Sequence, residues 1–402
     1  MRLTTSAILA VLSAPALAAP MLAPGPDDLV ATRVVALPAP AGALERKPVS
    51  FGWALDPAAT VAAQPAFVGE SREWYQHVEA AQLRAGVAFD ATAPGAVVRL
   101  SPLGTARPVA TSSLQLRRDG RDVAPAQAFA KRADADTLKA AGFDPGAGSV
   151  VAQIDPALGA GRFEIRQGDA QGRYLLHVFE PDSAKVLHAG ATRASVHAGG
   201  SIEVRARLEG TAGTQFGGQL VSPSGRTVDL AFVAGADGLA RASARLPGDA
   251  AVEAGLWEAQ VFAEGRDGTV RVQRDGRAPI AVVQPTARLL GDVRVGRAGL
   301  GYALPVQVGA PGRYEVAATL FATGRDGLAH PVAQSASAAW LEPGTHTLRL
   351  AYDRAHVPAG FGAPYELRGL TLKDQGRMGL LESRAVALKV STTVEVARAG
   401  RR

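Results

Sequence analysis

Residues 200–283 alternate apolar and polar side chains with almost no interruption, and this period of two limits the possible folds more than any other feature of the sequence. The first run places four apolar residues in alternation with polar ones: Ile202, Val204, Ala206 and Leu208. Such alternation is typical of a strand with one buried face. Gly, Pro or Asp-Gly turns separate further runs of this kind, and about seven short strands divided by turns predict an immunoglobulin-like sandwich.

Similar strand patterns lie on both sides of this segment. Residues 29–181 form a predicted N-terminal β-rich module, with strands expected at 32–37, 96–101, 113–117, 149–154, 161–166 and 172–180. Residues 184–284 and 286–396 form two predicted immunoglobulin-like modules. Pro305, in the first strand of the last module, predicts an edge position because proline has no N–H to donate. The predicted fold class is all-β, with tandem immunoglobulin-like β-sandwiches after an N-terminal β-rich module.

Two short helices are expected inside the N-terminal module. The first covers residues 71–84, where Ser71 is suited to the N-cap and apolar residues recur on one face. The second covers residues 134–141 and ends at Gly142, because glycine is favoured after the last turn of a helix. These helices interrupt a β-rich module and leave the fold class unchanged.

Three segments begin with a glycine, one further residue and an aromatic ring, at Gly172, Gly255 and Gly312. A tight turn explains the glycine, and a core anchor explains the aromatic residue. The spacing between the segments is unequal, so they are either three equivalent strands or only similar strand starts. For Gly312 the second interpretation is favoured, because residues 362–372 form a better late strand for the last module.

The tripeptide Arg-Asp-Gly occurs four times, beginning at Arg118, Arg266, Arg274 and Arg325. Asp-Gly is a favoured pair in hairpin turns, because both positions accept a positive φ. The tripeptide is therefore interpreted as a turn, and two of its copies are expected to bracket a strand at residues 269–273.

The N-terminus has the features of a secretory signal peptide. Arg2 precedes a short apolar run, and small residues stand at the minus-three and minus-one positions of a cleavage point after Ala18. Residues 1–18 are expected to be removed, residues 19–28 to be disordered because they are rich in Pro and Gly, and the tail 397–402 to fray. No other stretch reaches the roughly 18 apolar residues of a transmembrane helix. The mature protein is expected in the periplasm or outside the cell, without a transmembrane segment.

The composition narrows the range of partners. The chain has no cysteine, so an exported form has no disulfides and depends on apolar burial for its stability. The net charge is +6, but the basic residues alternate with apolar ones along the strands and form no block. Nucleic-acid binding is not expected, because it needs a clustered basic patch. Attraction to anionic surface polymers stays open.

Motifs of catalysis and metal binding are missing from the sequence. It contains no Gly-x-Ser-x-Gly elbow, no His-Glu-x-x-His pair, no phosphate loop and no dinucleotide fingerprint. The 7 histidines are scattered, and only His77, with Glu73 and Glu79 nearby, has surroundings that suggest a site. We expect no catalytic residue, no metal and no cofactor.

Aromatic residues are densest in one stretch near the N-terminus: Phe51, Trp53, Phe67, Trp74, Tyr75 and Phe89. One interpretation is that they fill the core of the N-terminal module, as large rings usually do. The other is that some of them line a groove for a sugar or a peptide. In that case the candidate ligand-binding residues are Trp53, Trp74, Tyr75 and His77.

Four stretches carry a resemblance to a known family: SREWYQHVEAAQLRAGVAFDATAPGAVVRLSPL from Ser71, AGLWEAQVFAEGRDG from Ala254, SAAWLEPGTHTLRLAYD from Ser337 and APYELRGLTLKDQGRMGLLESRAVAL from Ala363. The chain resembles secreted bacterial proteins of an uncharacterised domain-of-unknown-function family, which have an N-terminal β-rich module and two immunoglobulin-like modules. The resemblance implies this fold and export. It brings no active-site residues.

The expected function is that of an exported, non-catalytic binding or surface-associated protein. Stacked sandwiches usually present loops and sheet faces to a partner, here a surface polysaccharide or another exported protein. The alternative is a hydrolase, or an accessory protein of one, with a site near Trp53, Trp74, Tyr75 and His77. A periplasmic chaperone that lends an exposed edge strand to its clients is a third hypothesis.

Overall fold

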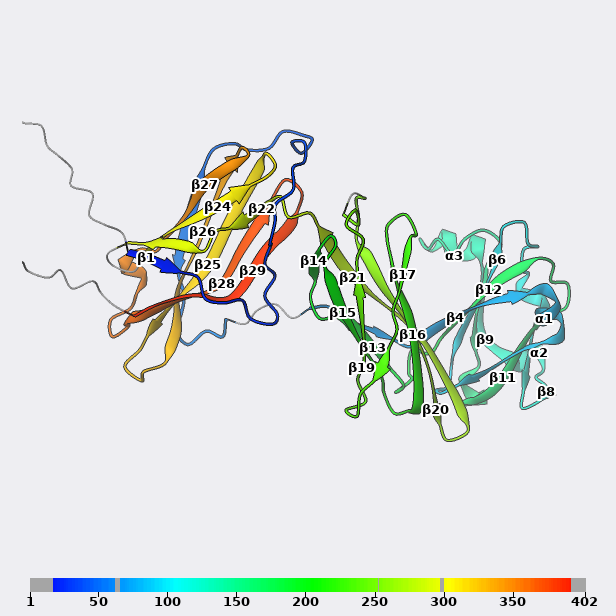
Figure 1. The fold of residues 1–402 in the computed structure, drawn as a ribbon. Helices are drawn as coiled ribbons and strands as arrows, with labels where there is room; N and C mark the ends of the chain where they lie inside the picture. The colour runs from blue at the N-terminus through cyan, green and yellow to red at the C-terminus, as the bar shows by residue number, and fades with distance from the viewer. Residues whose placement is uncertain (1–16, 62–65, 252, 297–299, 392–402) are drawn as a thin grey trace, which may run out of the picture. The chain divides into compact units, whose positions relative to one another are not determined.

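The computed structural model describes residues 17–61, 66–251, 253–296 and 300–391. Strands make up 55% of the structure and helices 7%, which confirms the all-β prediction. The chain divides into two compact units (Figure 1). The terminal unit combines Met1–Gln64 with Val283–Arg402, and the inserted unit is Pro65–Val282. Each unit is described by itself below.

Residues 73–179 of the inserted unit form the N-terminal module, which packs two antiparallel sheets around one core. The first sheet has the order β4 (Glu73–Glu79), β12 (Arg173–Phe179), β6 (Val97–Leu103), β10 (Val150–Ile154) and β9 (Phe129–Asp134). The second has the order β5 (Val87–Ala91), β11 (Gly161–Gln167), β7 (Leu114–Arg118) and β8 (Arg121–Asp122). The helical pieces are α1 (Ala80–Ala85), α2 (Pro125–Ala128), α3 (Ala135–Ala140), η1 (Thr111–Ser113) and η2 (Pro156–Leu158).

The second half of the inserted unit is the middle sandwich, which has a core of its own. One sheet has the order β18 (Val233–Ala234), β19 (Ala240–Arg245), β15 (Ser201–Leu208), β13 (Leu187–Ala191) and β3 (Val68–Ser71). The other has the order β14 (Ser195–His197), β21 (Val270–Val283), β20 (Trp257–Asp267), β16 (Ala212–Val221) and β17 (Thr227–Asp229). The alternation noted in the sequence thus places one face of every long strand in this core.

The terminal unit is a third sandwich. One sheet has the order β1 (Leu17–Pro20), β23 (Asp292–Val295), β24 (Gly301–Val308) and β22 (Ala287–Leu289), and β24 also pairs with β27 (Gly344–Ala351). The other has the order β2 (Val49–Ala54), β26 (Ala329–Leu341), β25 (Gly312–Thr323), β28 (Gly362–Asp374) and β29 (Gly379–Val390). A short turn, η3 (Arg354–His356), precedes β28.

The predicted helix at 71–84 is wrong over most of its length. Ser71 ends β3, residues 73–79 form β4, and only α1 is helical. Trp74 and Val78 are buried four residues apart, a spacing that fits both a helix face and one side of a strand. Pairing with β12 along the whole of β4 decides for the strand. The helix predicted at 134–141 is confirmed as α3, capped by the Asp134 side chain, which accepts a hydrogen bond from the Thr137 N–H.

All three Gly-x-aromatic segments open a strand that has a partner on each side, namely β12, β20 and β25. Each aromatic ring is buried, and its polar tip donates to a backbone carbonyl: Tyr174 to Arg107 at 2.9 Å, Trp257 to Ala250 at 2.9 Å and Tyr314 to Ala310 at 2.7 Å. A buried ring with a satisfied polar tip fixes the start of the strand. The places of these strands in the sheets differ, however. β20 pairs with the last strand of its sandwich, β21, and in the terminal unit it is β28 that pairs with the last strand, β29. Gly312 therefore opens a similar strand start and not the equivalent strand, and residues 362–372 lie in the late strand β28, as predicted.

The N-terminal segment completes the sheets of the terminal unit. β1 pairs with β23. The Leu22 N–H then donates to the Ala387 carbonyl at 2.9 Å, and Leu29 forms a β-bridge with Ser383, so this stretch follows β29. β2 covers the opposite edge of the same sheet by pairing with β26. In Figure 1 the blue chain accordingly lies beside the orange and red strands. The segment closes three strand edges that would otherwise be open.

This arrangement corrects two predicted boundaries. Residues 19–28 are ordered, because β1 and a hydrogen bond from the Met21 N–H to the Gly291 carbonyl (2.8 Å) fix them. Residues 29–54 belong to the terminal unit and not to the N-terminal module, and no strand forms at 32–37. The segment is ordered although it is rich in Pro and Gly, because its backbone pairs with strands of the terminal unit that would otherwise have an unpaired edge. Most of the predicted signal peptide, residues 1–16, and the predicted tail lie outside the described residues.

Pro305 was predicted to mark an edge strand and lies instead inside a sheet, in β24. β27 pairs with β24 on one side, and β22 and β23 pair with it on the other. The neighbouring chain is interrupted opposite the proline, and Leu290, between β22 and β23, donates its N–H to the Pro305 carbonyl at 2.8 Å. The missing N–H of the proline faces this gap, so no ladder hydrogen bond is lost.

A buried carboxylate in the terminal unit gives its stability a pH dependence. Glu382 is 0% exposed, its Oε1 accepts from the Leu289 N–H at 2.9 Å, and Arg384 Nε is 3.9 Å from Oε2. Burial raises the pKa of Glu382 from 4.5 to about 7. Because the folded state favours the protonated form, its stabilising contribution is fully present below pH 4.5 and is lost as the pH rises through 7.

The variant Glu382→Gln is expected to remove this pH dependence and to raise the free energy of unfolding at pH 8 by about 1–3 kcal/mol. Urea unfolding of the terminal unit at several pH values would measure the effect. Glu342→Gln, at an exposed position, is the matched control and should leave the pH profile unchanged. A Glu382→Gln profile as steep as that of the natural chain would contradict the assignment.

Candidate functional site

The structure does not bring the four candidate residues from the sequence together. Trp74 is 2% exposed and packs edge-on against Phe89, with centroids 6.2 Å apart, so it belongs to the core. Tyr75 is half-buried and His77 is exposed, both on β4. Trp53 lies on β2, in the other compact unit. No single groove is formed by these side chains.

Ionisable side chains cluster around Tyr75 on the outer face of β4 and β12. The Tyr75 ring stacks on His177 with centroids 4.3 Å apart. The Glu73 carboxylate bonds to both, at 3.0 Å from the Tyr75 hydroxyl and 2.8 Å from His177 Nε2. The Tyr75 N–H donates to Asp275 Oδ2 of the middle sandwich at 2.7 Å. These four residues form a hydrogen-bonded polar surface.

The environment sets the protonation of this cluster. Burial raises the pKa of Asp275 to about 6 and that of Tyr75 to about 12. The hydrogen bond with His177 lowers the pKa of Glu73. Tyr75 therefore keeps its proton at neutral pH and acts as a hydrogen-bond donor. The carboxylate of Glu73 orients the His177 imidazole, which is the geometry of a general-base pair.

The Arg-Asp-Gly tripeptide at Arg274 is not a turn, because β21 continues through it while paired with β20. Arg274 and Glu180 form a fully buried ion pair, with Nη1 and Oε1 2.9 Å apart. Glu180 also accepts from the Thr92 N–H at 2.6 Å, and Arg274 Nη2 donates to Ser183 Oγ at 2.9 Å. This network fixes β21 of the middle sandwich to the N-terminal module. The other three copies of the tripeptide are turns between strands, as predicted.

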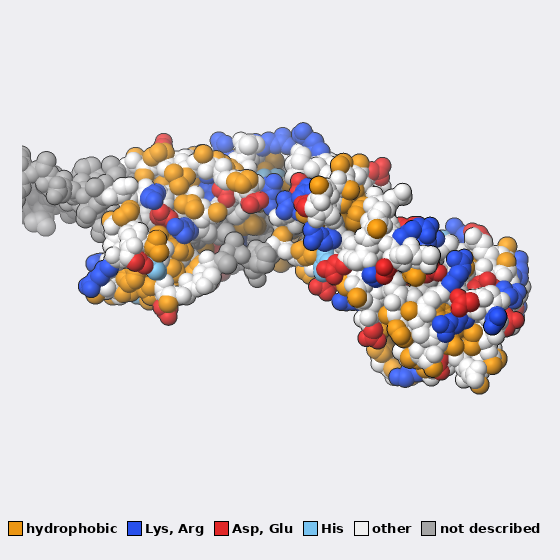
Figure 2. Space-filling view, turned by 90° about the horizontal axis from the view of Figure 1, so that it is seen from below, with side chains coloured by type: hydrophobic (Ala, Val, Ile, Leu, Met, Phe, Trp, Pro, Cys, Tyr) orange, Lys and Arg blue, Asp and Glu red, His pale blue; other side chains and the backbone are white. Residues whose placement is uncertain are grey.

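β2 exposes two aromatic rings at the edge of its sheet. Phe51 is 61% exposed and Trp53 is 45% exposed, and because they stand two residues apart they share a face. The positions beside them on β26 and β25 carry small or polar side chains: Ala336, Gln334, Ala317 and Thr319. Figure 2 shows exposed hydrophobic side chains in orange among interspersed acidic and basic ones. We call the two rings the aromatic edge.

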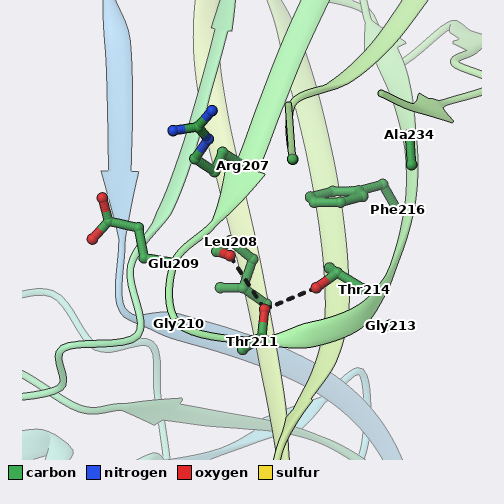
Figure 3. Close-up of a pocket in the computed structure, with 10 residues that line it drawn as sticks. Arg207, Leu208, Glu209, Gly210, Thr211, Gly213, Thr214, Phe216 and Ala234 are labelled. Atoms are coloured by element: carbon green, nitrogen blue, oxygen red, sulfur yellow. Dashed lines mark hydrogen bonds between the residues drawn. The ribbon is translucent and has the colours of Figure 1, made fainter. Parts of the chain in front are cut away.

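A pocket of about 410 Å³ opens in the middle sandwich at the connection from β15 to β16 (Figure 3). Its lining includes Arg207, Glu209, Thr211, Thr214, Phe216 and Ala234. In Figure 3 the Phe216 ring projects from one side, the two threonines lie below it, and Arg207 and Glu209 lie on the other side. The register of β16 against β20 shifts between Ala212 and Gln215, and such a bulge re-aims side chains.

This pocket was not predicted from the sequence. Its only signal was a break in the alternation, the stretch TAGTQF from Thr211, which interrupts two regular strands. Within the described parts of the chain, no group of three or more His, Cys, Asp or Glu side chains is placed to hold a metal ion. No helix in these parts is long and apolar enough to cross a membrane.

Known proteins resemble this chain in fold. The solved structure of a DUF4785 family protein from Legionella pneumophila has a TM-score of 0.66 and 20% identity, and the match covers 91% of this chain and 99% of that one. Escherichia coli alpha-2-macroglobulin matches with a TM-score of 0.25 and 12% identity over 73% of this chain and 20% of that one, which supports no conclusion. No curated protein matches the sequence.

The sequence matches two parts of one described family. Residues 40–180 match the "Domain of unknown function (DUF4785) N-terminal domain", and residues 286–391 match the "Domain of unknown function (DUF4785) C-terminal domain". Residues 181–285, which carry every strand of the middle sandwich except β3, lie between the two matches. The chain therefore belongs to the DUF4785 family of multi-module, β-rich proteins, whose function is uncharacterised.

Proposed function

We propose that the protein is an exported, non-catalytic binding protein that recognises a carbohydrate polymer at a cell surface. The observation that carries the proposal is the aromatic edge, where Phe51 and Trp53 expose about half of their surface on one face of β2. Grouped apolar side chains rimmed by polar ones are typical of binding surfaces. The export part of the proposal rests on the apolar N-terminus and its small residues before position 19.

The chemistry of the aromatic edge fits a sugar chain. Residues two apart on a strand are separated by roughly 7 Å, so both rings can contact adjoining sugar units of one chain. The apolar face of a sugar ring packs on an aromatic ring, and the Gln334 amide, opposite Trp53 in the sheet, is placed to bond sugar hydroxyls. The side chains beside the rings on β26 and β25 are short or unbranched, so they leave room for an extended polymer.

Replacing both rings, in the variant Phe51→Ala with Trp53→Ala, is expected to weaken polysaccharide binding at least about tenfold. Each aromatic contact is worth on the order of 1 kcal/mol, and 1.4 kcal/mol is tenfold in affinity. Co-sedimentation of the purified protein with peptidoglycan, lipopolysaccharide aggregates and insoluble neutral glycans would measure it. Binding through the rings should persist at high salt, since only charge-driven attraction is screened.

Phe143→Ala is the matched control for this experiment. Phe143 is 65% exposed and belongs to the inserted unit, so its removal changes surface hydrophobicity without touching the aromatic edge. The proposal fails if the natural chain binds none of these polymers, or if the double variant binds as tightly as the Phe143→Ala control.

A hydrolase is the alternative, and the Glu73–His177 pair is the observation that favours it. Binding is preferred because, within the described residues, no serine, threonine or cysteine side chain is hydrogen-bonded to the side chains of this pair, so the pair has no side-chain nucleophile to activate. Shortening of a bound polymer during the binding experiment would instead favour the hydrolase.

A further inference from the structure

We infer that the pocket between β15 and β16 of the middle sandwich is a binding site for a single neutral sugar ring. This site lies in the inserted unit and shares no residue with the aromatic edge. Its volume of about 410 Å³ is within the range of small-molecule sites, roughly 300–1,000 Å³. Its wall, floor and rim each supply a different part of sugar recognition.

The wall of the pocket is the Phe216 ring. Phe232 lies against it, with centroids 6.1 Å apart and planes tilted by 42°. Gly218 leaves room for Phe232, because a Cβ at this position would lie 3.1 Å from Phe232 Cε2. The aromatic pair thus holds Phe216 in place as an apolar surface on which the C–H face of a sugar ring packs.

The floor of the pocket carries two hydroxyl groups. Thr211 Oγ1 and Thr214 Oγ1 are 2.8 Å apart, and Thr211 Oγ1 also donates to the Leu208 carbonyl at 3.2 Å (Figure 3). The absence of a side chain at Gly265 makes this pair possible, since a Cβ there would lie 2.8 Å from Thr214 Oγ1 and 2.9 Å from Thr211 Oγ1. Because the Thr211 hydrogen lies on the Leu208 carbonyl and the Thr214 hydrogen on Thr211 Oγ1, the oxygen lone pairs of the floor are left to accept hydrogen bonds from the hydroxyls of a sugar.

The rim of the pocket carries one positive and one negative side chain. Arg207 Nη2 donates to the Asp237 carbonyl at 2.8 Å, and Glu209 Oε1 lies 3.1 Å from His188 Nε2, so neighbours orient both groups. A guanidinium donates hydrogen bonds and a carboxylate accepts them, and a ligand hydroxyl does both. The opposite charges of Arg207 and Glu209 leave the rim without a net charge, so it gives no net attraction to an anion or a cation and suits a neutral ligand.

The loop that joins wall and rim is preformed. Gly210 and Gly213 have φ values of 62° and 60°, which glycine adopts without strain. Lys185 Nζ donates to the Gly210 carbonyl at 2.6 Å and so ties the loop to the segment that precedes β13. A preformed site loses little conformational entropy when it binds a small ligand.

The test is saturation-transfer NMR on the full chain carrying Phe51→Ala and Trp53→Ala, so that the aromatic edge does not contribute. The probes are methyl β-glucopyranoside, methyl β-galactopyranoside and N-acetylglucosamine as neutral sugars, with glucuronate as the charged counterpart. We expect saturation of at least one neutral sugar and at least about fivefold less for glucuronate. Failure of the proposed polymer binding would leave this result unaffected, so the two proposals are separable.

Two further substitutions locate the binding. Phe216→Leu removes the ring and Thr214→Val removes a hydroxyl at constant shape, and each is expected to reduce the saturation at least about fivefold. The controls are Phe262→Leu and Thr227→Val, on strands of the same sheet and outside the pocket lining. The inference is overturned if no neutral sugar is saturated, if glucuronate is saturated more strongly, or if Thr214→Val binds as its control does.

Discussion

A chain that lacks residues 1–61 is expected to leave the terminal unit unfolded while the inserted unit keeps its fold. The deletion removes β1, β2 and the stretch along β29, which together close three sheet edges. It also removes Leu29 and Ala31, which are 5% and 4% exposed. The Arg313 guanidinium loses the carbonyls of Glu45 and Lys47, which accept from its Nη1 at 2.7 and 2.9 Å.

These losses should exceed the stability of the terminal unit. Single domains are stable by about 5–15 kcal/mol, and opened edges, exposed apolar side chains and an uncompensated buried guanidinium reach several kcal/mol together. Hydrogen exchange read by mass spectrometry would measure the result region by region. Protection should vanish in β22–β29 and persist in the strands of the inserted unit.

Addition of a peptide spanning residues 17–61 provides the control. Because the peptide carries all the missing strand partners, it should restore protection in β26 and β29, whereas a peptide of scrambled order should not. Full protection of β26 in the shortened chain without the peptide would show that the N-terminal segment is dispensable.

Breaking the buried ion pair of the inserted unit is the second large effect. Glu180→Gln keeps the shape of the side chain but leaves the Arg274 cation without its counter-charge in a site where both side chains are 0% exposed. Burial already lowers the pKa of Arg274, and the charge of Glu180 opposes this shift. The expected loss is about 3–5 kcal/mol of the free energy of unfolding.

Chemical unfolding followed in the inserted unit would measure this loss. The matched control is Glu264→Gln, which breaks the exposed pair with Arg271 (2.6 Å) on the hairpin of β20 and β21. Exposed pairs contribute about 0–1 kcal/mol, so the control should change little. A double variant with methionine at both 180 and 274 should recover much of the stability, because an apolar pair needs no counter-charge. Equal effects of Glu180→Gln and Glu264→Gln would contradict the role of the buried pair.

The pairing of β2 with β26 is expected to form late in folding. Val49 of β2 pairs with Ala338 of β26, and the whole inserted unit lies between them in sequence. Pairings between distant residues form slowly, because the loop-closure entropy is lost before the contact forms. The inserted unit has cores built from its own residues, so it does not depend on this closure.

Local features of the sequence were enough for most of the strands, for three of the four Arg-Asp-Gly turns and for one helix. Alternation at 200–208 placed β15, and the Asp134 side chain with Gly142 placed α3. The buried rings that open β12, β20 and β25 follow from the Gly-x-aromatic pattern. Each of these signals lies within a few residues of the structure that it determines, so no distant partner is needed to read it.

What only the tertiary structure decided is where each strand finds its partner. The sequence by itself determined an all-β chain with one buried face per strand. Pairing with β12 made residues 73–79 a strand, and pairing with β20 carried β21 through Arg274. Trp53 lies in a different unit from Trp74 and Tyr75, because β2 pairs with the edge of β26, which is far along the chain. The unpaired N–H and C=O groups of an edge strand bond to the backbone of another strand, and every residue has such a backbone. Side-chain patterns therefore do not specify which segment will pair with a given edge.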